Sequence, residues 1–284
     1  GKTRKPSIEM LEGIDLILYD IQDIGARFYT YITTLGLVME TAGILKIPVI
    51  ILDRPNPIRG DMIEGPMLDM DFQTFVGYYP IPIRYGGTVG ELAQKIIENK
   101  WVSPLPSLEV IKMEGWKNNL WFDETDLPWI KPSPNIPDLE TAIIYPGMCI
   151  IEGTNLSEGR GTQSPFKQIG APWIDGKLLS QKLNKYKLPG VVFKPVFFTP
   201  ISIPGMSTYP KFQDEKCSGI EIVIIDRNNY NSVNTGIVTL FTLYSMYSEN
   251  ITFKEKHLNR LWGSDQLLKE IKRGTLPLDF IEFY

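Results

Sequence analysis

The densest group of side chains able to do chemistry lies in residues 152–162 (EGTNLSEGRGT). This stretch combines two carboxylates with a guanidinium, and its glycines let a backbone approach a ligand closely. Two acids in different surroundings can divide the proton-donor and proton-acceptor roles of glycoside hydrolysis. We therefore predict catalytic roles for Glu152 and Glu158, with an ordinary solvated loop as the alternative. The neighbouring groups predicted to contact a ligand are Thr154, Asn155 and Arg160.

Two further polar loops each begin with an aspartate at the end of an apolar run. Asp20 ends residues 14–20 (IDLILYD), and Asp53 ends residues 47–53 (IPVIILD). Ligands of parallel α/β sheets bind outside the carboxyl ends of the strands, so both aspartates are candidate catalytic residues. The alternative is that they cap the following elements, with arginines as ion-pair partners. The polar residues of these loops predicted to bind a substrate are Gln22, Asp23, Arg27, Arg54 and Asn56.

Three charged residues follow these loops along the chain. Glu64 can face the same cleft, although an exposed turn is the alternative. Arg84 ends an extended run and is a candidate cation for a substrate carboxylate. Glu91, in contrast, lies three residues after Thr88, which is the spacing of a helix capping box, so we predict that it is structural.

Composition and charge exclude several classes of function. Hydrophobic residues make up 43% and charged residues 22%, as in soluble globular proteins. The net charge of −4, without a long basic run, argues against a nucleic-acid partner. The single histidine, His257, lies far along the chain from any dense polar motif, so histidine-based nucleophilic catalysis is not expected. The two cysteines, Cys149 and Cys217, are too few for a zinc site or a disulfide framework and are expected to be buried thiols.

The sequence contains no pattern for a cofactor or a membrane span. Neither a dinucleotide-binding glycine fingerprint nor a P-loop is present, so no cofactor and no metal are expected. No run reaches the about 18 consecutive apolar residues of a transmembrane helix.

Hydrophobic periodicity predicts the elements that position these loops. A segment of helical length at residues 27–46 lies between the two apolar runs, so a βαβ unit with a parallel sheet of buried strands is expected. Further elements predicted in this half are a helix at 88–99 and a strand at 108–113. In the second half we predict strands at 190–199 and 219–226, and helices at 175–184, 231–247 and 264–273. Pro195 is expected to break the first of those strands.

These elements predict an α/β protein of two domains. Residues 1–138 form an incomplete Rossmann-like domain with a mostly parallel sheet, and residues 139–284 form a smaller α+β domain. The boundary is expected in the proline-rich residues 128–137 (PWIKPSPNIP), because such a segment is neither regular helix nor central strand.

Taken in order, the polar blocks resemble those of the NamZ (YbbC-like) family of exo-β-N-acetylmuramidases. The blocks that carry the resemblance are DIQDIGARFYTY at 20–31, LDRPNP at 52–57, EGP at 64–66, PIPIRYG at 80–86, TVGELA at 88–93, PSPNIP at 132–137, EGTNLSEGRGT at 152–162 and IGAPW at 169–173. No single block would suffice, but so many in order across nearly the whole chain make the resemblance specific.

The resemblance implies a glycoside hydrolase that releases terminal N-acetylmuramic acid from the non-reducing end of peptidoglycan fragments, in cell-wall turnover and recycling. It implies an active site in a cleft between the two domains, muropeptides or glycan ends as partners, and substrate binding by Asn135. It also implies a secreted or envelope-associated bacterial protein, with a cytoplasmic location as the alternative. The competing function is a muropeptide-binding protein that cleaves no bond.

Two expectations concern the ends of the chain and the choice of sugar. The family carries an upstream Pro-Glu-His-Gly stretch with a candidate catalytic glutamate and a further C-terminal helix, so this chain is expected to be truncated at both ends. The lactyl carboxylate distinguishes muramic acid from N-acetylglucosamine, and an arginine is expected to bind it. The candidates, in order of preference, are Arg54, Arg160, Arg84 and Arg27.

Overall fold

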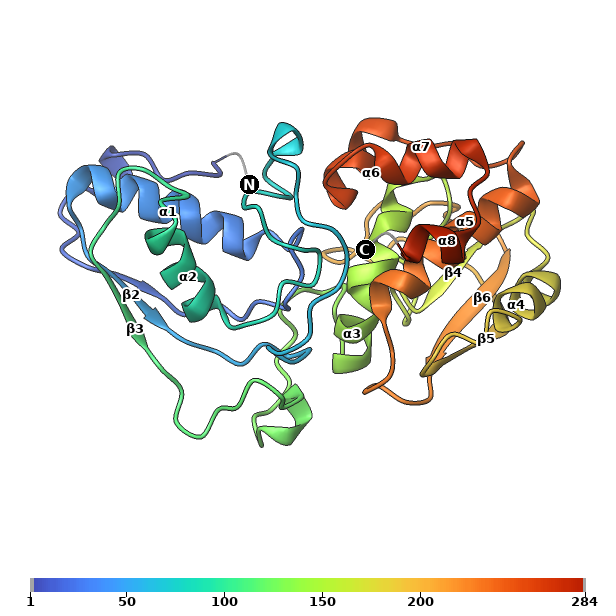
Figure 1. Ribbon diagram of the computed structural model, residues 1–284, viewed down its shortest axis with the longest axis horizontal. Helices are drawn as coiled ribbons and strands as arrows, with labels where there is room; N and C mark the ends of the chain where they lie inside the picture. The colour runs from blue at the N-terminus through green and yellow to red at the C-terminus, as the bar shows by residue number, and fades with distance from the viewer. Residues whose placement is uncertain (1–2, 283–284) are drawn as a thin grey trace. The chain divides into compact units, whose positions relative to one another are not determined.

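The computed structural model describes residues 3–282 of the 284-residue chain, which form two compact units (Figure 1). The first unit runs from the first described residue to Ile63 and continues as Gln73–Trp129. The second unit consists of Glu64–Phe72 and the chain from Ile130 onward. The predicted boundary after residue 138 stays a prediction. Within the described residues, no helix is long and apolar enough to cross a membrane.

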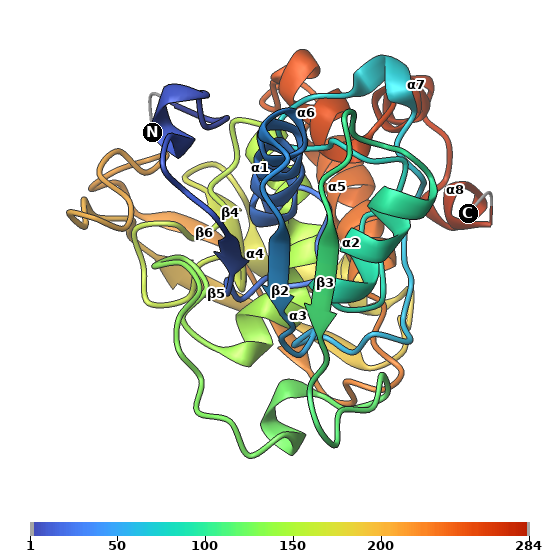
Figure 2. The same ribbon diagram turned by 90° about the vertical axis from the view of Figure 1, so that its left-hand side faces the viewer.

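The first unit is built on a parallel sheet of three strands in the order β1-β2-β3 (Figure 2). The strands are β1 (Ile17–Tyr19), β2 (Val49–Leu52) and β3 (Leu108–Ile111). Its two helices are α1 (Tyr31–Leu45) and α2 (Val89–Glu98), and its 3-10 turns are η1 (Glu9–Leu11) and η3 (Phe122–Glu124). The predicted βαβ unit and the parallel sheet are confirmed.

One face of this sheet carries the core of the first unit. Leu35 and Met39 of α1 and Ile96 of α2 are buried in one cluster with Val49 and Ile51 of β2. The prediction of buried strands was wrong for Leu18 of β1, which is 59% exposed. The physical reason is the alternation of side chains along a strand, since the core helices cover only one of the two faces.

Helix α2 begins where the sequence predicted. Thr88 is its N-cap, with Thr88 Oγ1 accepting from Glu91 N at 3.2 Å and Thr88 N donating to Glu91 Oε2 at 2.9 Å. These two reciprocal bonds satisfy two backbone donors that the helix leaves open. Gly86 and Gly87 lead into the cap with φ angles of 64° and 73°, a conformation that side chains with a Cβ rarely adopt.

The second unit contains an antiparallel sheet of three strands in the order β4-β6-β5. The strands are β4 (Gln168–Ala171), β5 (Val191–Phe198) and β6 (Cys217–Ile224). The prediction that Pro195 breaks β5 was wrong, because pairing with β6 runs through it from Val191 to Phe198. β5 lies at the edge of the sheet, where a residue without an N–H is tolerated.

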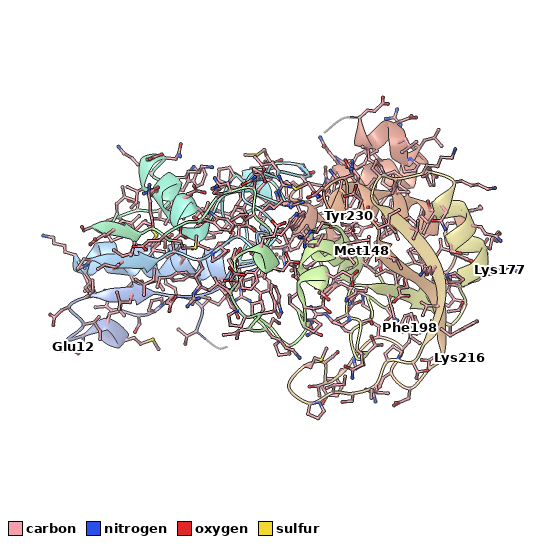
Figure 3. The ribbon with its side chains drawn as sticks, turned by 90° about the horizontal axis from the view of Figure 1, so that it is seen from below. Glu12, Met148, Lys177, Phe198, Lys216 and Tyr230 are labelled. Carbon is pink, nitrogen blue, oxygen red and sulfur yellow. The ribbon has the colours of Figure 1, made fainter. Side chains whose placement is uncertain are left out.

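Helices make up most of the rest of the second unit. They are α3 (Leu139–Met148), α4 (Gly176–Asn184), α5 (Ser232–Tyr247), α6 (Glu255–Trp262), α7 (Gln266–Arg273) and α8 (Pro277–Ile281), with 3-10 turns η2 (Met70–Phe72) and η4 (Cys149–Gly153). Helices α3 and α5 approach each other closely at Gly147. A Cβ added there would lie 1.8 Å from the carbonyl oxygen of Ser232, so only glycine fits. The buried Met148 and Tyr230 lie inside this unit, whereas Lys177 of α4 lies at its surface (Figure 3).

The α/β class with a second α+β domain is confirmed. The second unit is the larger of the two in this chain and not the smaller, because the helices α5 to α8 add a layer that has no counterpart in the first unit. The pattern-based elements omitted β4, α3, α6 and α8. β4 and α8 are only 4 and 5 residues long, and α3 contains Pro146.

Candidate functional site

The loop after β1 contains a buried carboxyl group. Asp23 is 3% exposed, and its Oδ2 accepts hydrogen bonds from Gly25 N and Tyr85 OH, both at 2.7 Å. Its Oδ1 is buried without a hydrogen-bond partner in the part of the chain that the structure describes. Burial raises the pKa of Asp23 to about 7. The predicted substrate ligand is therefore an interior group that ties the β1 loop to Tyr85.

The same loop also places Asp20 and Gln22. Asp20 forms an ion pair with Arg54, with 2.6 Å between Asp20 Oδ1 and Arg54 Nη2, and both side chains are exposed. Gln22 donates from Nε2 to the carbonyl oxygens of Asp23 at 2.7 Å and Pro55 at 2.8 Å. The loops after β1 and β2 are thus joined directly, as their place at one sheet edge predicts.

Asp53, at the end of β2, holds the start of α2. Its Oδ2 accepts from Thr88 Oγ1 at 2.6 Å, and its Oδ1 accepts from Gly90 N at 2.8 Å and Arg54 N at 3.0 Å. These contacts match the alternative interpretation, in which the aspartate caps the following element. A catalytic role for Asp53 or Asp20 stays a prediction.

Two of the four candidate arginines are interior residues. Arg27 is fully buried and donates from Nη1 to the carbonyl oxygen of Ile81 at 2.8 Å, and burial lowers its pKa to about 9. Arg84 is 1% exposed and donates to the carbonyl oxygen of Ile58. Its Cζ atom lies 5.7 Å from the centre of the Trp121 ring. Both guanidinium groups therefore hold backbone segments of the first unit together.

The loop amides of the first unit have similar structural contacts. Asn56 is buried, donates to the carbonyl oxygen of Gly87 at 2.8 Å and accepts from Ile58 N at 3.2 Å. It thereby fixes the two-glycine turn ahead of α2.

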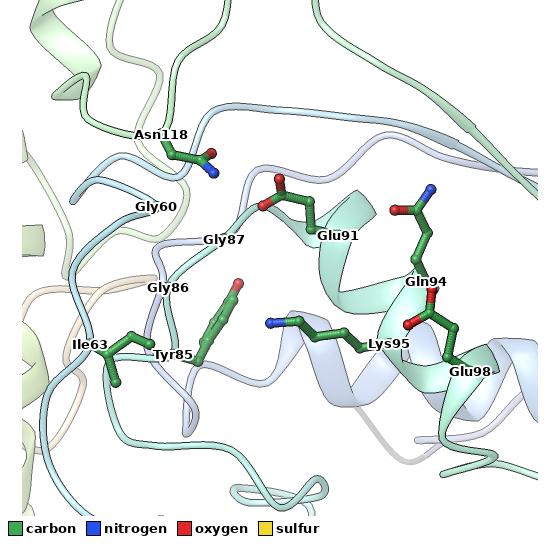
Figure 4. A pocket seen from close by; sticks show the side chains of 10 residues that line it. All are labelled: Gly60, Ile63, Tyr85, Gly86, Gly87, Glu91, Gln94, Lys95, Glu98 and Asn118. Atoms are coloured by element: carbon green, nitrogen blue, oxygen red, sulfur yellow. The ribbon is translucent and has the colours of Figure 1, made fainter.

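A pocket of about 400 Å³ opens in the first unit beside α2, and we call it the α2 pocket (Figure 4). It is lined by Gly60, Ile63, Tyr85, Gly86, Gly87, Glu91, Gln94, Lys95, Glu98 and Asn118. A neighbouring pocket of about 240 Å³ shares the wall of Glu91, Gln94 and Asn118 and adds Asp53 and Lys112. Asp53 and Lys112 directly follow β2 and β3, so the neighbouring pocket lies at the carboxyl end of the parallel sheet, where α/β proteins bind ligands.

The loop at 152–160 in the second unit forms a network of charges that we call the ionic cluster. Arg160 Nη2 lies 2.5 Å from Glu152 Oε1, and Arg160 Nε lies 3.5 Å from Glu158 Oε1. Lys211 Nζ donates to Glu158 Oε2 at 2.8 Å, and His257 Nε2 lies 3.7 Å from Glu152 Oε2. The five members of the cluster are Glu152, Glu158, Arg160, Lys211 and His257.

The ionic cluster favours the charged form of Glu152. Burial opposes ionisation, but the neighbouring imidazole of His257 and the charge of Arg160 outweigh it, and the pKa of Glu152 lies below its ordinary value. An ionised carboxylate suits a base, a nucleophile or electrostatic stabilisation rather than proton donation. Glu158 is nearly enclosed, with a side chain only 6% exposed.

Sequence reasoning missed two members of the ionic cluster. His257 was set aside because it lies far along the chain from the polar motifs, yet the fold brings it to Glu152. Lys211 lies in the segment between β5 and β6 and also donates to the carbonyl oxygens of Ile151 at 3.3 Å and Leu156 at 2.8 Å. No spacing rule joins either residue to the 152–160 loop, because the pairings are tertiary.

Two other candidates in this loop stabilise its shape. Thr154 is buried, donates to the carbonyl oxygen of Ile151 at 2.8 Å and accepts from Leu156 N at 3.0 Å. Asn155 bridges to the carbonyl oxygen of Asn250 at 2.9 Å and to Thr252 N at 3.0 Å.

The last two candidates are also anchored inside the second unit. Glu64 is buried, and its Oε2 accepts from Val233 N at 3.0 Å in the first turn of α5, where a negative charge is favourable. Asn135 donates to the carbonyl oxygen of Met206 at 2.8 Å. Cys149 and Cys217 are free and buried, as expected.

The predicted convergence of Asp20, Asp53 and the 152–160 loop stays a prediction, as do the substrate-binding roles of the residues above. In the part of the chain that the structure describes, no group of three His, Cys, Asp or Glu side chains is arranged to hold a metal ion.

Comparisons with known proteins cover both units. The sequence model described as "Exo-beta-N-acetylmuramidase NamZ, N-terminal" matches residues 1–140, and the corresponding C-terminal model matches residues 143–283. The peptidoglycan β-N-acetylmuramidase NamZ of Bacillus subtilis (strain 168) is 43% identical over 285 residues, which span 100% of this chain and 67% of that protein.

Two solved structures are also similar, both of DUF1343 family proteins from Bacteroides fragilis NCTC 9343. The first aligns with a TM-score of 0.89 and 34% identity, over 96% of this chain and 71% of its own. The second aligns with a TM-score of 0.80 and 30% identity, over 98% of this chain and 73% of its own. The resemblance found in the polar blocks is confirmed, and the chain belongs to the NamZ family of exo-β-N-acetylmuramidases.

Proposed function

We propose that this protein is a glycoside hydrolase that releases terminal N-acetylmuramic acid from the non-reducing end of peptidoglycan fragments. The observation that carries the proposal is the 43% identity to a peptidoglycan β-N-acetylmuramidase over the whole chain. The identity spans both units and all the polar blocks, so it does not depend on a single motif. A muropeptide-binding protein without activity is not favoured, because the relative that matches from end to end is named as an enzyme.

We propose glycan ends of peptidoglycan fragments, or muropeptides, as the partners, in cell-wall turnover and recycling. The proposed location is secreted or associated with the bacterial envelope, with the cytoplasm as the alternative. Cell fractionation with an antibody against the protein tests the location, because a signal confined to the cytosolic fraction would contradict it.

Within this activity, the ionic cluster supplies the first carboxylates to test. Glycosidases use a pair of carboxyl groups, one of which is ionised while it assists the departure or capture of the sugar. Glu152 fits the ionised member, because Arg160 and His257 keep its pKa low. We expect Glu152→Gln to lower kcat by a factor of about 100 or more, in the range found when a positioned acid or base is removed. The matched control is Glu255→Gln, which removes a carboxylate from an exposed ion pair with Lys272.

The experiment that tests the activity is incubation of the full-length protein with the 4-nitrophenyl β-glycoside of N-acetylmuramic acid. Release of nitrophenol is expected, and the N-acetylglucosamine glycoside serves as the control for sugar specificity. Binding of the muramic acid glycoside without release would identify a non-catalytic binding protein and overturn the proposal.

A further inference from the structure

The α2 pocket contains a cation, the ammonium group of Lys95. Lys95 lies on α2, one turn after Glu91, and forms no ion pair among the described residues. In Figure 4 its ammonium group points across the pocket toward the ring of Tyr85. An exposed lysine usually remains in solvent, but this one lines a cavity of about 400 Å³. That volume falls in the range of about 300–1,000 Å³ typical of ligand sites.

The arginines first considered for a substrate carboxylate are engaged elsewhere. Arg27 and Arg84 are buried against backbone carbonyl groups. Arg160 lies between two glutamates, and Arg54 is paired with Asp20. Each would have to give up an existing partner before it could bind an anionic sugar, whereas Lys95 would not.

The remaining walls of the α2 pocket suit a sugar ring. Tyr85 lines the pocket with the 5% of its surface that is exposed, and its hydroxyl group is fixed by the hydrogen bond to Asp23 at 2.7 Å. Gln94 and Asn118 offer amide donors and acceptors for hydroxyl or acetamido groups. Gly86 and Gly87 line the pocket with backbone alone, at φ angles of 64° and 73° that side chains with a Cβ rarely adopt.

Charge in the α2 pocket makes Lys95 necessary for an anionic ligand. Glu91 and Glu98 also line it, so a carboxylate would otherwise meet only negative side chains. Glu91 Oε2 accepts from Thr88 N at 2.9 Å and remains part of the helix cap. Lys95 is therefore the group that can make the pocket accept an acid.

We infer that the α2 pocket binds the muramic acid ring of a peptide-free glycan end and that the ammonium group of Lys95 pairs with its free lactyl carboxylate. This inference rests on the proposed function. It assigns to the first unit a residue that selects the sugar.

Two other cavities are weaker candidates for the same role. The neighbouring pocket with Lys112 is about 240 Å³, below the usual size of a ligand site. A cavity of about 300 Å³ in the second unit is lined by Lys272 and Arg273, but these pair with Glu255 at 2.5 Å and Glu270 at 3.5 Å.

The test compares the acid and its neutral lactyl methyl ester, both as 4-nitrophenyl β-glycosides of N-acetylmuramic acid, on the full-length protein. Lys95→Met is expected to lower kcat/KM for the acid by about 10- to 100-fold, because it removes one hydrogen bond to a charged group. The value of kcat/KM for the ester is expected to change by less than about twofold. Lys112→Met is the matched control, since it removes the same charge from the neighbouring pocket and is expected to change neither substrate. Melting temperatures should be unchanged, because neither lysine has an ion pair among the described residues.

The outcomes separate this inference from the proposed function. The inference would be overturned if Lys95→Met lowered kcat/KM equally for the acid and the ester, or lowered it for neither. It would also be overturned if Lys112→Met lowered kcat/KM for the acid alone. If the unaltered protein cleaves neither glycoside, the proposed function fails. Calorimetric binding of free N-acetylmuramic acid and its methyl ester then still decides whether Lys95 reads the carboxylate.

Discussion

Replacing Asp23 by asparagine should remove a pH dependence from the stability of the first unit. The Asp23 carboxyl group is buried, with Oδ2 bonded to Gly25 N and Tyr85 OH and Oδ1 unpaired within the described chain. Burial raises its pKa from an ordinary value of 3.8 to about 7. The folded protein therefore keeps a proton on Asp23 over a range of pH in which the unfolded chain has released it.

The sign of the effect follows from this difference in bound protons. Below pH 3.8 both states are protonated, and the raised pKa has no effect. Between that value and about pH 7 the free energy of unfolding falls by about 1.4 kcal/mol per pH unit, a total of about 4 kcal/mol. Above pH 7 both states are ionised and the loss is constant. This stability is thus present in acid and lost as the pH rises.

Asp23→Asn should cancel that loss at a smaller cost. The new amide must place an N–H₂ group where Oδ1 has no partner, which costs about 1–3 kcal/mol. The variant is therefore expected to be about 1–3 kcal/mol more stable than the unaltered protein at pH 8, and less stable at pH 4. Asparagine does not titrate, so the difference between the two proteins should change steadily between these limits.

Urea unfolding at several pH values between 4 and 8 measures this difference. Asp20→Asn is the control, because Asp20 is exposed and its substitution should shift the curve by less than about 1 kcal/mol. Parallel curves for the unaltered protein and Asp23→Asn would refute the argument, since they would show that Asp23 has the same pKa in both states.

Three further substitutions test individual contacts. Glu91→Gln should keep much of the α2 cap and of the activity, and a collapse of turnover at an unchanged melting temperature would show that the structural role is wrong. Lys211→Met should lower the free energy of unfolding in urea by about 2–4 kcal/mol, because it leaves the enclosed Glu158 with Arg160 as its nearest cation; a loss below 1 kcal/mol would contradict this. Glu64→Gln should lower the free energy of unfolding by about 1–2 kcal/mol, because it removes the negative charge that accepts from Val233 N in the first turn of α5. An unchanged urea midpoint would show that this contact does not stabilise the fold.

The sequence by itself was enough for features that depend on neighbouring residues. The apolar runs ending at Asp20 and Asp53 gave β1 and β2, and the Thr88 spacing gave the capping box of α2. These features are predictable because the hydrogen bonds of a cap and the alternation or continuity of apolar residues are local. The ordered polar blocks also identified the family, which the comparisons confirmed.

Only the tertiary structure decided which polar side chains are engaged and by what. Arg27 and Arg84 were predicted to be ligand-binding cations but are buried against carbonyl groups, while Lys95, which no motif singles out, lines a pocket. His257 and Lys211 join the 152–160 loop from distant segments. The sequence determines the charge of a side chain, but the fold determines its partner, because it brings distant segments within the reach of a hydrogen bond or an ion pair, 2.8 Å for Lys211 and Glu158 and 3.7 Å for His257 and Glu152.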